Sequence, residues 1–160
     1  MYGREPMSSA DTSRIQRTGA SRTVAVLECL RSAFAPFELA YAAAAYEDTV
    51  LTSEAFVRRL EQTVFIAVDG NGPVVGTIAC SMMSEAEGHL RGMAVQPEWQ
   101  ASGTADRLLQ YAEDELIKRN CRRITLDTTE PLQRAMRFYE RHGYRRSGKV
   151  QDFFEMPLIE

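Results

Sequence analysis

Residues 95–109, VQPEWQASGTADRLL, constrain the possible folds more than any other part of the chain. Small and polar residues separate a β-rich run from apolar residues at helical spacing, a pattern typical of a strand, a tight turn and an amphipathic helix. Gly103 has no Cβ, so a ligand can approach the backbone of the turn closely. Free N–H groups and the positive end of the helix dipole favour an anion such as a pyrophosphate. The segment therefore predicts an anion site on a strand–turn–helix unit.

The rest of the chain predicts further helices and strands around this unit. Periodicity, turn residues and helix-start residues predict the elements before it. The first are a weak strand at 14–17, a helix at 22–34 ended by Pro36, a helix or ordered loop at 39–46, and a helix from Thr52 to about 61. A hairpin of strands 64–68 and 74–79 across Asp69-Gly-Asn-Gly-Pro73 and a strand at 88–95 follow. Those after it are a helix to about 120, a strand at 123–127, a helix from Pro131 to a cap at Gly143, and closing strands at 144–150 and 153–159. This order predicts an α/β fold with a mixed central sheet of about six to seven strands and helices on both faces.

Size and composition fit a single soluble domain. The 160 residues suit a single domain, expected at 13–160 behind a poorly ordered segment at 1–12. A net charge of −3 gives no electrostatic case for nucleic acid or an anionic membrane. No run is apolar enough for a signal peptide or a membrane span. Three dispersed cysteines suit free thiols in a cytoplasmic protein and have no metal-ligand spacing, so no metal is expected.

Two motifs in the second half resemble those of one enzyme family. Gln100-x-x-Gly103-x-Ala105 resembles the acyl-CoA-binding signature of the Gcn5-related N-acetyltransferases (GNAT). About thirty residues later, AMRFYERHGY at 135–144 is similar to the family's late helix motif. The resemblance covers about residues 22–159 and implies the acyl-CoA N-acyltransferase fold.

The resemblance also implies roles for individual residues. The backbone of the loop would hold the CoA pyrophosphate through Gln100, Ala101, Ser102, Gly103, Thr104 and Ala105. A bulge near Arg91 and Gly92 would free N–H groups for the thioester carbonyl and the pantetheine arm, at Met93, Ala94 and Val95. Tyr139 would be the general acid that protonates the departing thiolate. Two departures stand out: Ala101 replaces a frequent Gly, and Pro131 and Leu132 occupy the region where many members carry a CoA-contacting Asn.

The sequence says less about the base and the acceptor. Glu87 is the first candidate for the general base, with Glu85 and His89 as alternatives, although a residue of this kind is more often a solvated strand or loop residue than a base. Residues 38–48 would wall the acceptor pocket, where acidic and aromatic side chains suit a cationic amine (Glu38, Tyr41, Tyr46, Glu47 and Asp48). A solvated loop explains them equally well.

The predicted activity is transfer of an acetyl group from acetyl-CoA to a primary amine within a ternary complex. Two alternatives stay open: a non-catalytic acyl-CoA-binding or regulatory module of the same fold, and a structural domain whose loop binds nothing. Polyamines, aminoglycosides, amino acids and protein amines all remain possible acceptors. A homodimer is a common assembly for such a protein.

Overall fold

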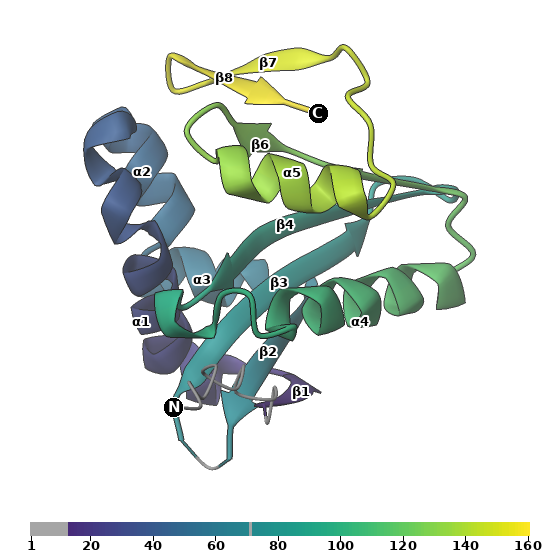
Figure 1. The fold of residues 1–160 in the computed structure, drawn as a ribbon. Coiled ribbons are helices and arrows are strands. Elements are labelled where there is room, and N and C mark those ends of the chain that lie inside the picture. The colour runs from purple at the N-terminus through teal and green to yellow at the C-terminus, as the bar shows by residue number, and fades with distance from the viewer. Residues whose placement is uncertain (1–12, 71) are drawn as a thin grey trace, which may run out of the picture.

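The structure is a computed structural model that describes residues 13–70 and 72–160 (Figure 1). The expectation of poor order at 1–12 and the Asn71 position of the hairpin turn lie outside the described residues. In chain order the elements are β1 (Ser13–Arg17), a 3₁₀ turn (Ala20–Arg22), α1 (Thr23–Phe34), a 3₁₀ segment (Ala35–Ala40), α2 (Ala43–Val50), α3 (Ser53–Arg59), β2 (Thr63–Asp69), β3 (Val74–Met82), β4 (Glu87–Val95), a 3₁₀ turn (Pro97–Trp99), α4 (Thr104–Lys118), β5 (Arg123–Leu126), β6 (Thr128–Thr129), α5 (Gln133–Arg141), β7 (Val150–Phe153) and β8 (Met156–Ile159).

The strands form two sheets. The main sheet has the order β1-β2-β3-β4-β5, in which β1 to β4 are antiparallel and β5 runs parallel to β4. The chain leaves this sheet at Asp127, and β6 then pairs with β8 in a second sheet of order β6-β8-β7. The predicted single sheet of six to seven strands is therefore divided into a mixed five-stranded sheet and a three-stranded one.

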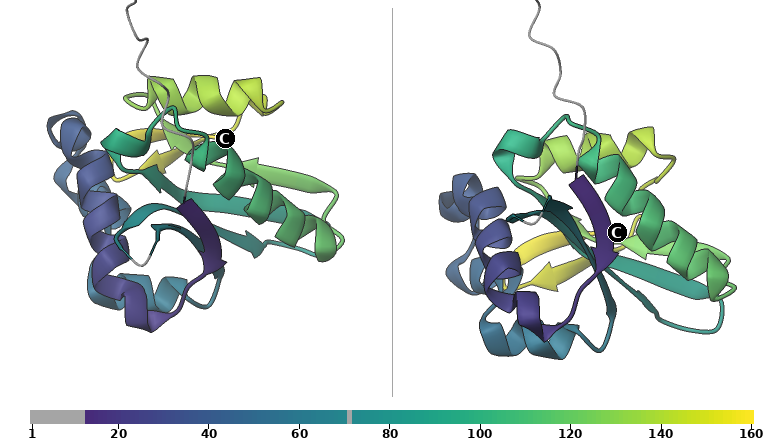
Figure 2. Two further views of the ribbon diagram at one scale, coloured as in Figure 1. Left: turned by 60° about the horizontal axis from the view of Figure 1, so that its bottom comes forward. Right: turned by 90° about the horizontal axis from the view of Figure 1, so that it is seen from below.

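Helices cover both faces of the main sheet, as predicted (Figures 1 and 2). Side chains alternate along a strand, so each strand serves two cores. One core joins α1 and α3 to one face of β2 and β3, and the other joins α4 to the opposite face. On β2, for example, Ile66 enters the first core and Ala67 the second, and both are fully buried.

The helix ends follow the local chemistry of the sequence. The Thr52 hydroxyl accepts a hydrogen bond from the Ala55 N–H at 3.1 Å and caps α3. Gly143 has φ +89° and ends α5, where the Tyr144 N–H donates to the Tyr139 carbonyl at 3.1 Å, so the predicted cap is confirmed. Two boundaries were wrong. Residues 144–149 are not a strand, and β7 begins only at Val150. The helix predicted to start at Pro131 begins at Gln133.

Candidate active site

The main sheet splits between β4 and β5. The parallel pairing runs from Glu87 opposite Arg123 to Leu90 opposite Leu126 and then stops, because β5 ends and the chain turns into β6. From residue 91 to 95, β4 stays paired with β3 only. The edge of β4 that faces the split therefore keeps backbone groups available to an extended ligand.

A bulge lies in β4 at the start of this free edge. The β3–β4 register moves from Ala79 opposite Arg91 to Thr77 opposite Ala94, which leaves two residues of β4 against one of β3. Gly92 sits in this irregularity with φ +63°, a conformation that favours glycine. The predicted bulge at Arg91 and Gly92 is confirmed, and it redirects the N–H groups that follow it.

The loop after β4 has the backbone shape of an anion site. Ala101 and Gly103 both have left-handed φ, +61° and +94°, and α4 begins directly after Gly103. Ser102 Oγ donates to the Trp99 carbonyl at 2.5 Å and meets Thr104 Oγ1 at 2.8 Å, which fixes the loop from inside. In the described part of the chain, no protein group accepts from the N–H groups of Ala101, Gly103 and Ala105. These donors, with the N-terminal end of α4, form the predicted anion cradle.

Gln100 connects this loop to the split and to α5. Its Nε2 donates to the Val95 carbonyl at 3.3 Å, and its Oε1 accepts from Arg134 Nη1 at 2.9 Å. Arg134 thus places a guanidinium beside the loop. The sequence analysis missed it, because only the packing of α5 over the sheet brings these two segments together.

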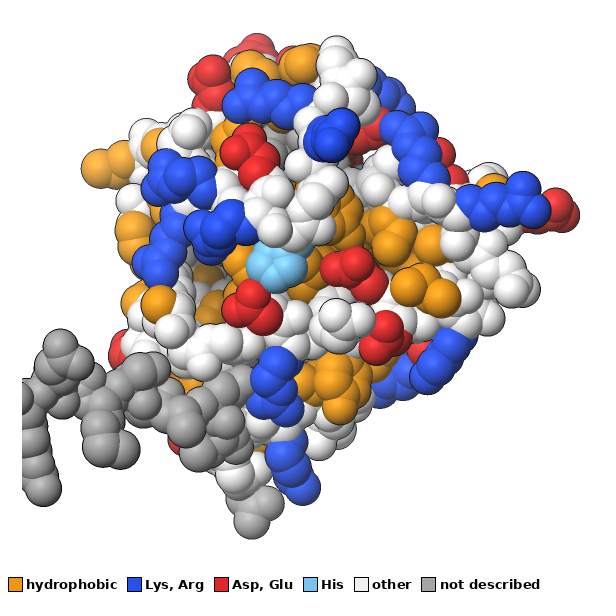
Figure 3. Space-filling view, turned by 45° about the vertical axis from the view of Figure 1, so that its right-hand side comes forward, with side chains coloured by type: hydrophobic (Ala, Val, Ile, Leu, Met, Phe, Trp, Pro, Cys, Tyr) orange, Lys and Arg blue, Asp and Glu red, His pale blue; other side chains and the backbone are white. Residues whose placement is uncertain are grey.

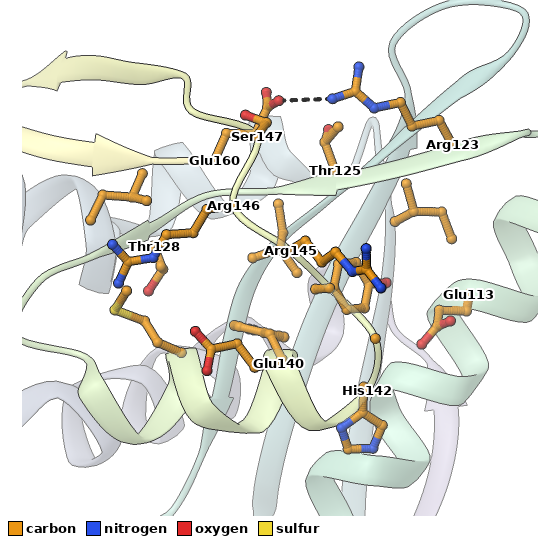
Figure 4. A pocket seen from close by; sticks show the side chains of 17 residues that line it. Glu113, Arg123, Thr125, Thr128, Glu140, His142, Arg145, Arg146, Ser147 and Glu160 are labelled. Atoms are coloured by element: carbon orange, nitrogen blue, oxygen red, sulfur yellow. Dashed lines mark hydrogen bonds and ion pairs between the residues drawn. The ribbon is translucent and has the colours of Figure 1, made fainter.

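A cavity of about 370 Å³ lies beside α5 (Figure 4). Tyr139 is one of the residues that line it. The cavity follows β5 and β6 from Arg123 to Thr128 and so reaches the point where the sheet splits. Tyr139 packs edge-to-face against Tyr144, with ring centroids 6.0 Å apart. Burial raises the pKa of the Tyr139 phenol, so this side chain is protonated at neutral pH, as a free phenol also is, and it is a weaker acid than a free phenol.

The cavity also contains polar atoms that no protein group satisfies. Among the described residues, Thr128 Oγ1 and the Tyr144 hydroxyl are buried without a hydrogen-bond partner, and both line the cavity. At its outer rim Arg123 is paired with Glu160 at 3.2 Å, and Figure 4 shows Arg145 and Arg146 approaching from the segment after α5. The cavity wall therefore combines apolar side chains such as Met136 with buried hydroxyls and with charged groups at the rim.

A histidine–aspartate pair occupies the opposite face of the split. His89 Nδ1 is 2.7 Å from Thr125 Oγ1, and His89 Nε2 is 3.3 Å from Asp127 Oδ2. His89 is buried, whereas the Asp127 side chain keeps 27% of its exposure, so the carboxylate is open to a substrate. Asp127 was missed in the sequence, where it is only the last residue of a short predicted strand.

Glu87 lies two residues before His89 on β4, on the same face and about 7 Å along the strand, and its partner is Arg123. It stands at the first position of β4, opposite Arg123, and its Oε2 is 3.5 Å from Arg123 Nη1. Six residues separate it from Met93, which is about 20 Å along a strand. Its role as a base stays a prediction, and its geometry favours a structural ion pair.

Residues 38–48, which were expected to wall the acceptor pocket, are only partly buried. Tyr41 is buried, and its hydroxyl is 2.6 Å from Thr129 Oγ1 on β6, so this segment does contact the far side of the split. Tyr46 packs edge-to-face on Tyr41. The carboxylates of Glu38, Glu47 and Asp48 are on exposed residues.

Other chemistries receive no support from the described residues. Residues 13–70 and 72–160 contain no group of three His, Cys, Asp or Glu side chains that could hold a metal, and no helix among them is long and apolar enough to cross a membrane. Burial raises the pKa of the Cys80 thiol to about 11, which keeps it a poor nucleophile. On the face seen in Figure 3, basic and acidic side chains are interspersed around hydrophobic ones.

The sequence of this chain matches the family model of the acetyltransferase (GNAT) family over residues 25–144. The chain belongs to the GNAT family. The curated N-alpha-acetyltransferase 30 of Schizosaccharomyces pombe is 29% identical to it over 103 residues, which are 62% of this chain and 68% of the relative.

Solved acetyltransferases show the same GNAT fold. The PaiA N-acetyltransferase of Thermoplasma acidophilum, solved with coenzyme A, has a TM-score of 0.76 at 14% identity and covers 92% of this chain and 96% of its own. The ribosomal-protein-S18-alanine N-acetyltransferase of Escherichia coli has a TM-score of 0.71 at 18% identity, with 92% and 90% covered. The predicted fold, the acetyltransferase class and acetyl-CoA as cosubstrate are confirmed at the level of the family.

Proposed function

We propose that residues 13–160 form one acetyltransferase domain that moves an acetyl group directly from acetyl-CoA to a primary amine. The observation that carries this proposal is the junction of two features: a loop with unpartnered N–H groups, and a split strand edge that begins at Gly92 and leads to it. Gln100 joins the two through its bond to the Val95 carbonyl. One elongated ligand with a diphosphate at one end and an acyl group at the other fits both.

In this proposal the loop from Gln100 to Ala105 binds the pyrophosphate of CoA through its unpartnered N–H groups, which belong to Ala101, Gly103 and Ala105. Arg134, beside Gln100, adds a positive charge for the phosphates. Those N–H groups of Met93, Ala94 and Val95 that point to the free edge of β4 orient the pantetheine arm and the acyl carbonyl. A backbone donor aimed at that carbonyl oxygen stabilises the negative charge that develops during attack.

The protons are handled by two groups on opposite faces of the split. The amine nitrogen forms a bond to the acyl carbon as the carbon–sulfur bond breaks. Asp127, oriented by His89, accepts the proton that the amine nitrogen loses, directly or through water. Tyr139, which is protonated at neutral pH, gives its proton to the thiolate of CoA. No covalent bond to the protein forms in this scheme.

The acceptor class follows from the same site and from the relatives. The name of the fission-yeast relative supports a peptide α-amine as the first class to test. The small net charge and the mixed charges of Figure 3 support a protein that acts without nucleic acid or membrane lipid. We propose a cytoplasmic location, which suits the three unpaired cysteines, and a homodimer as the assembly to test first.

The test is a screen of acetyl-CoA consumption against a mixed library of amines and peptide N-termini, with products identified by mass. Turnover by the wild type that falls in Tyr139→Phe and Asp127→Asn, with CoA binding retained, supports the enzyme. CoA binding without turnover across the library would favour the non-catalytic module. Saturating acetyl-CoA must also raise the melting temperature, because a ligand that binds only the native state stabilises it.

A further inference from the structure

Two arginines meet at the β4 bulge, on the face of the sheet that carries His89 and Asp127. Arg59, the last residue of α3, places Nη1 so close to Gly92 that a Cβ at that glycine would be 2.7 Å from it. Arg91 pairs with Ala79, whose side chain belongs to the core under α1 and α3, so Arg91 points to this same face. Neither side chain is on an exposed residue.

These two guanidinium groups are not neutralised by the protein. Within residues 13–70 and 72–160, no hydrogen bond from the side chain of Arg59 or Arg91 and no ion pair within 4.0 Å joins either guanidinium to another group. Arg91 Nε is buried without a partner. Burial and the charge of Arg91 lower the pKa of Arg59, and the charge of Asp48 opposes them. Two like charges held together and partly desolvated are costly unless an anion binds between them.

The position of the pair relates it to the acceptor amine. Arg91 lies two residues beyond His89 on the same strand, and such residues lie on the same face about 7 Å apart. His89 contacts Asp127, the proposed base. An amine held at Asp127 would therefore carry its nearest substituents toward Arg91 and Arg59.

We infer that the acceptor is an amine with an anionic group, a carboxylate or phosphate, a few bonds from its nitrogen, and that Arg59 and Arg91 bind this anion. This inference rests on the proposed function, and it replaces the cationic amine that the acidic residues at 38–48 suggest in the sequence. Those carboxylates lie on exposed residues. The guanidinium pair lies beside the split and offers bidentate donors to an oxyanion.

The test compares acceptors that differ only in the anionic group. The peptide arm pairs N-terminal Asp with Asn and Glu with Gln, and the small-molecule arm pairs β-alanine with its amide and phosphoethanolamine with ethanolamine. We expect the wild type to favour the anionic member of at least one arm by about ten- to a hundredfold in kcat/KM, as a charged hydrogen bond predicts. The arm that shows the preference identifies the source of the anion.

The variants assign the preference to residues. Arg59→Gln and Arg91→Gln should each reduce the anionic-to-neutral ratio about tenfold without changing the KM for acetyl-CoA. Arg58→Gln, an exposed neighbour on α3, is the matched control and should leave the ratio unchanged. Because ratios are compared between variants, differences in amine basicity within a pair cancel. Melting temperatures confirm that each variant is folded.

Binding of the same pairs to the enzyme loaded with CoA separates this inference from the proposed function. Charge-selective binding without transfer keeps the anion subsite and refutes the proposed activity. Transfer to neutral and anionic amines at equal rates keeps the activity and refutes the subsite. If no pair binds and no pair is acetylated, both the anion subsite and the activity on these amines are refuted.

Discussion

The substitution Gly103→Ala gives the sharpest test of the anion loop. Gly103 has φ +94°, and a Cβ there meets no atom within 4 Å, so the substitution adds backbone strain without a clash. A left-handed conformation costs an L-residue about 1–2 kcal/mol. The Gly103 N–H makes no backbone hydrogen bond, so φ at this residue can change. The Gly103 carbonyl then keeps its bond from the Arg107 N–H at 3.2 Å, and the side-chain bonds of Ser102 oppose the change only in part. CoA must then restore the original shape, and the same 1–2 kcal/mol raises its Kd about five- to thirtyfold.

Gly143→Ala is the matched control, because Gly143 has φ +89° and equally open space. Here the Tyr144 N–H bond to the Tyr139 carbonyl holds the conformation. The strain should therefore lower the stability of the Gly143→Ala variant. Its melting temperature should fall by about 2–8 °C, and the larger shift corresponds to a strain of about 2 kcal/mol. Calorimetric titration with CoA and thermal scans of both variants measure the two effects. An unchanged CoA affinity in Gly103→Ala, with a loss of stability equal to that of Gly143→Ala, would refute the proposed role of the loop.

Three further predictions concern the proton-transfer groups and the buried phenols. Tyr139→Phe should lower kcat by about 10²–10⁴-fold while the Kd for CoA stays constant; a normal kcat would remove Tyr139 from the chemistry. Asp127→Asn should lower kcat/KM for the amine by about 10²-fold or more in steady-state assays, with partial recovery at high pH, where more of the amine is unprotonated. Glu87→Gln should change kcat/KM less than about threefold. A larger loss in Glu87→Gln than in Asp127→Asn would favour Glu87 as the base. Burial raises the phenol pKa values of Tyr139 and Tyr144 in the folded state, so the unfolded chain releases these protons first as pH rises above about 10. Stability is then complete below that pH and falls above it, and thermal scans from pH 8 to 11 should show a smaller fall for Tyr144→Phe.

The parts of the site that are local in sequence could be predicted from it. The loop at 100–105 follows from one turn, with a glycine before an amphipathic helix, and Gly103 indeed precedes α4. Gly92 within a strand predicted the bulge, because an isolated glycine there often marks one. These features depend on φ angles and spacing, and both are written in consecutive residues.

The remaining parts depend on pairings between distant segments. Asp127 meets His89 only because β5 lies parallel to β4, and the register places Thr125 beside that histidine. Arg59 reaches Gly92 only because α3 packs under the sheet. The single predicted sheet was divided because the chain turns out of β5 at Asp127, a bend that no proline or glycine marks.

The free edge of β4 is also a possible site of aggregation, and its short length and irregular shape limit this risk. An open strand edge can pair with the edge of another molecule, which is a common route to aggregation. This edge is only the five residues from 91 to 95, and the bulge at Gly92 interrupts its regular geometry at the start. A regular strand from another chain therefore finds few consecutive groups to pair with, whereas a flexible ligand can follow the irregular edge. The same glycine that aims donors at an acyl group also keeps the unliganded protein from acting as a template for sheet growth.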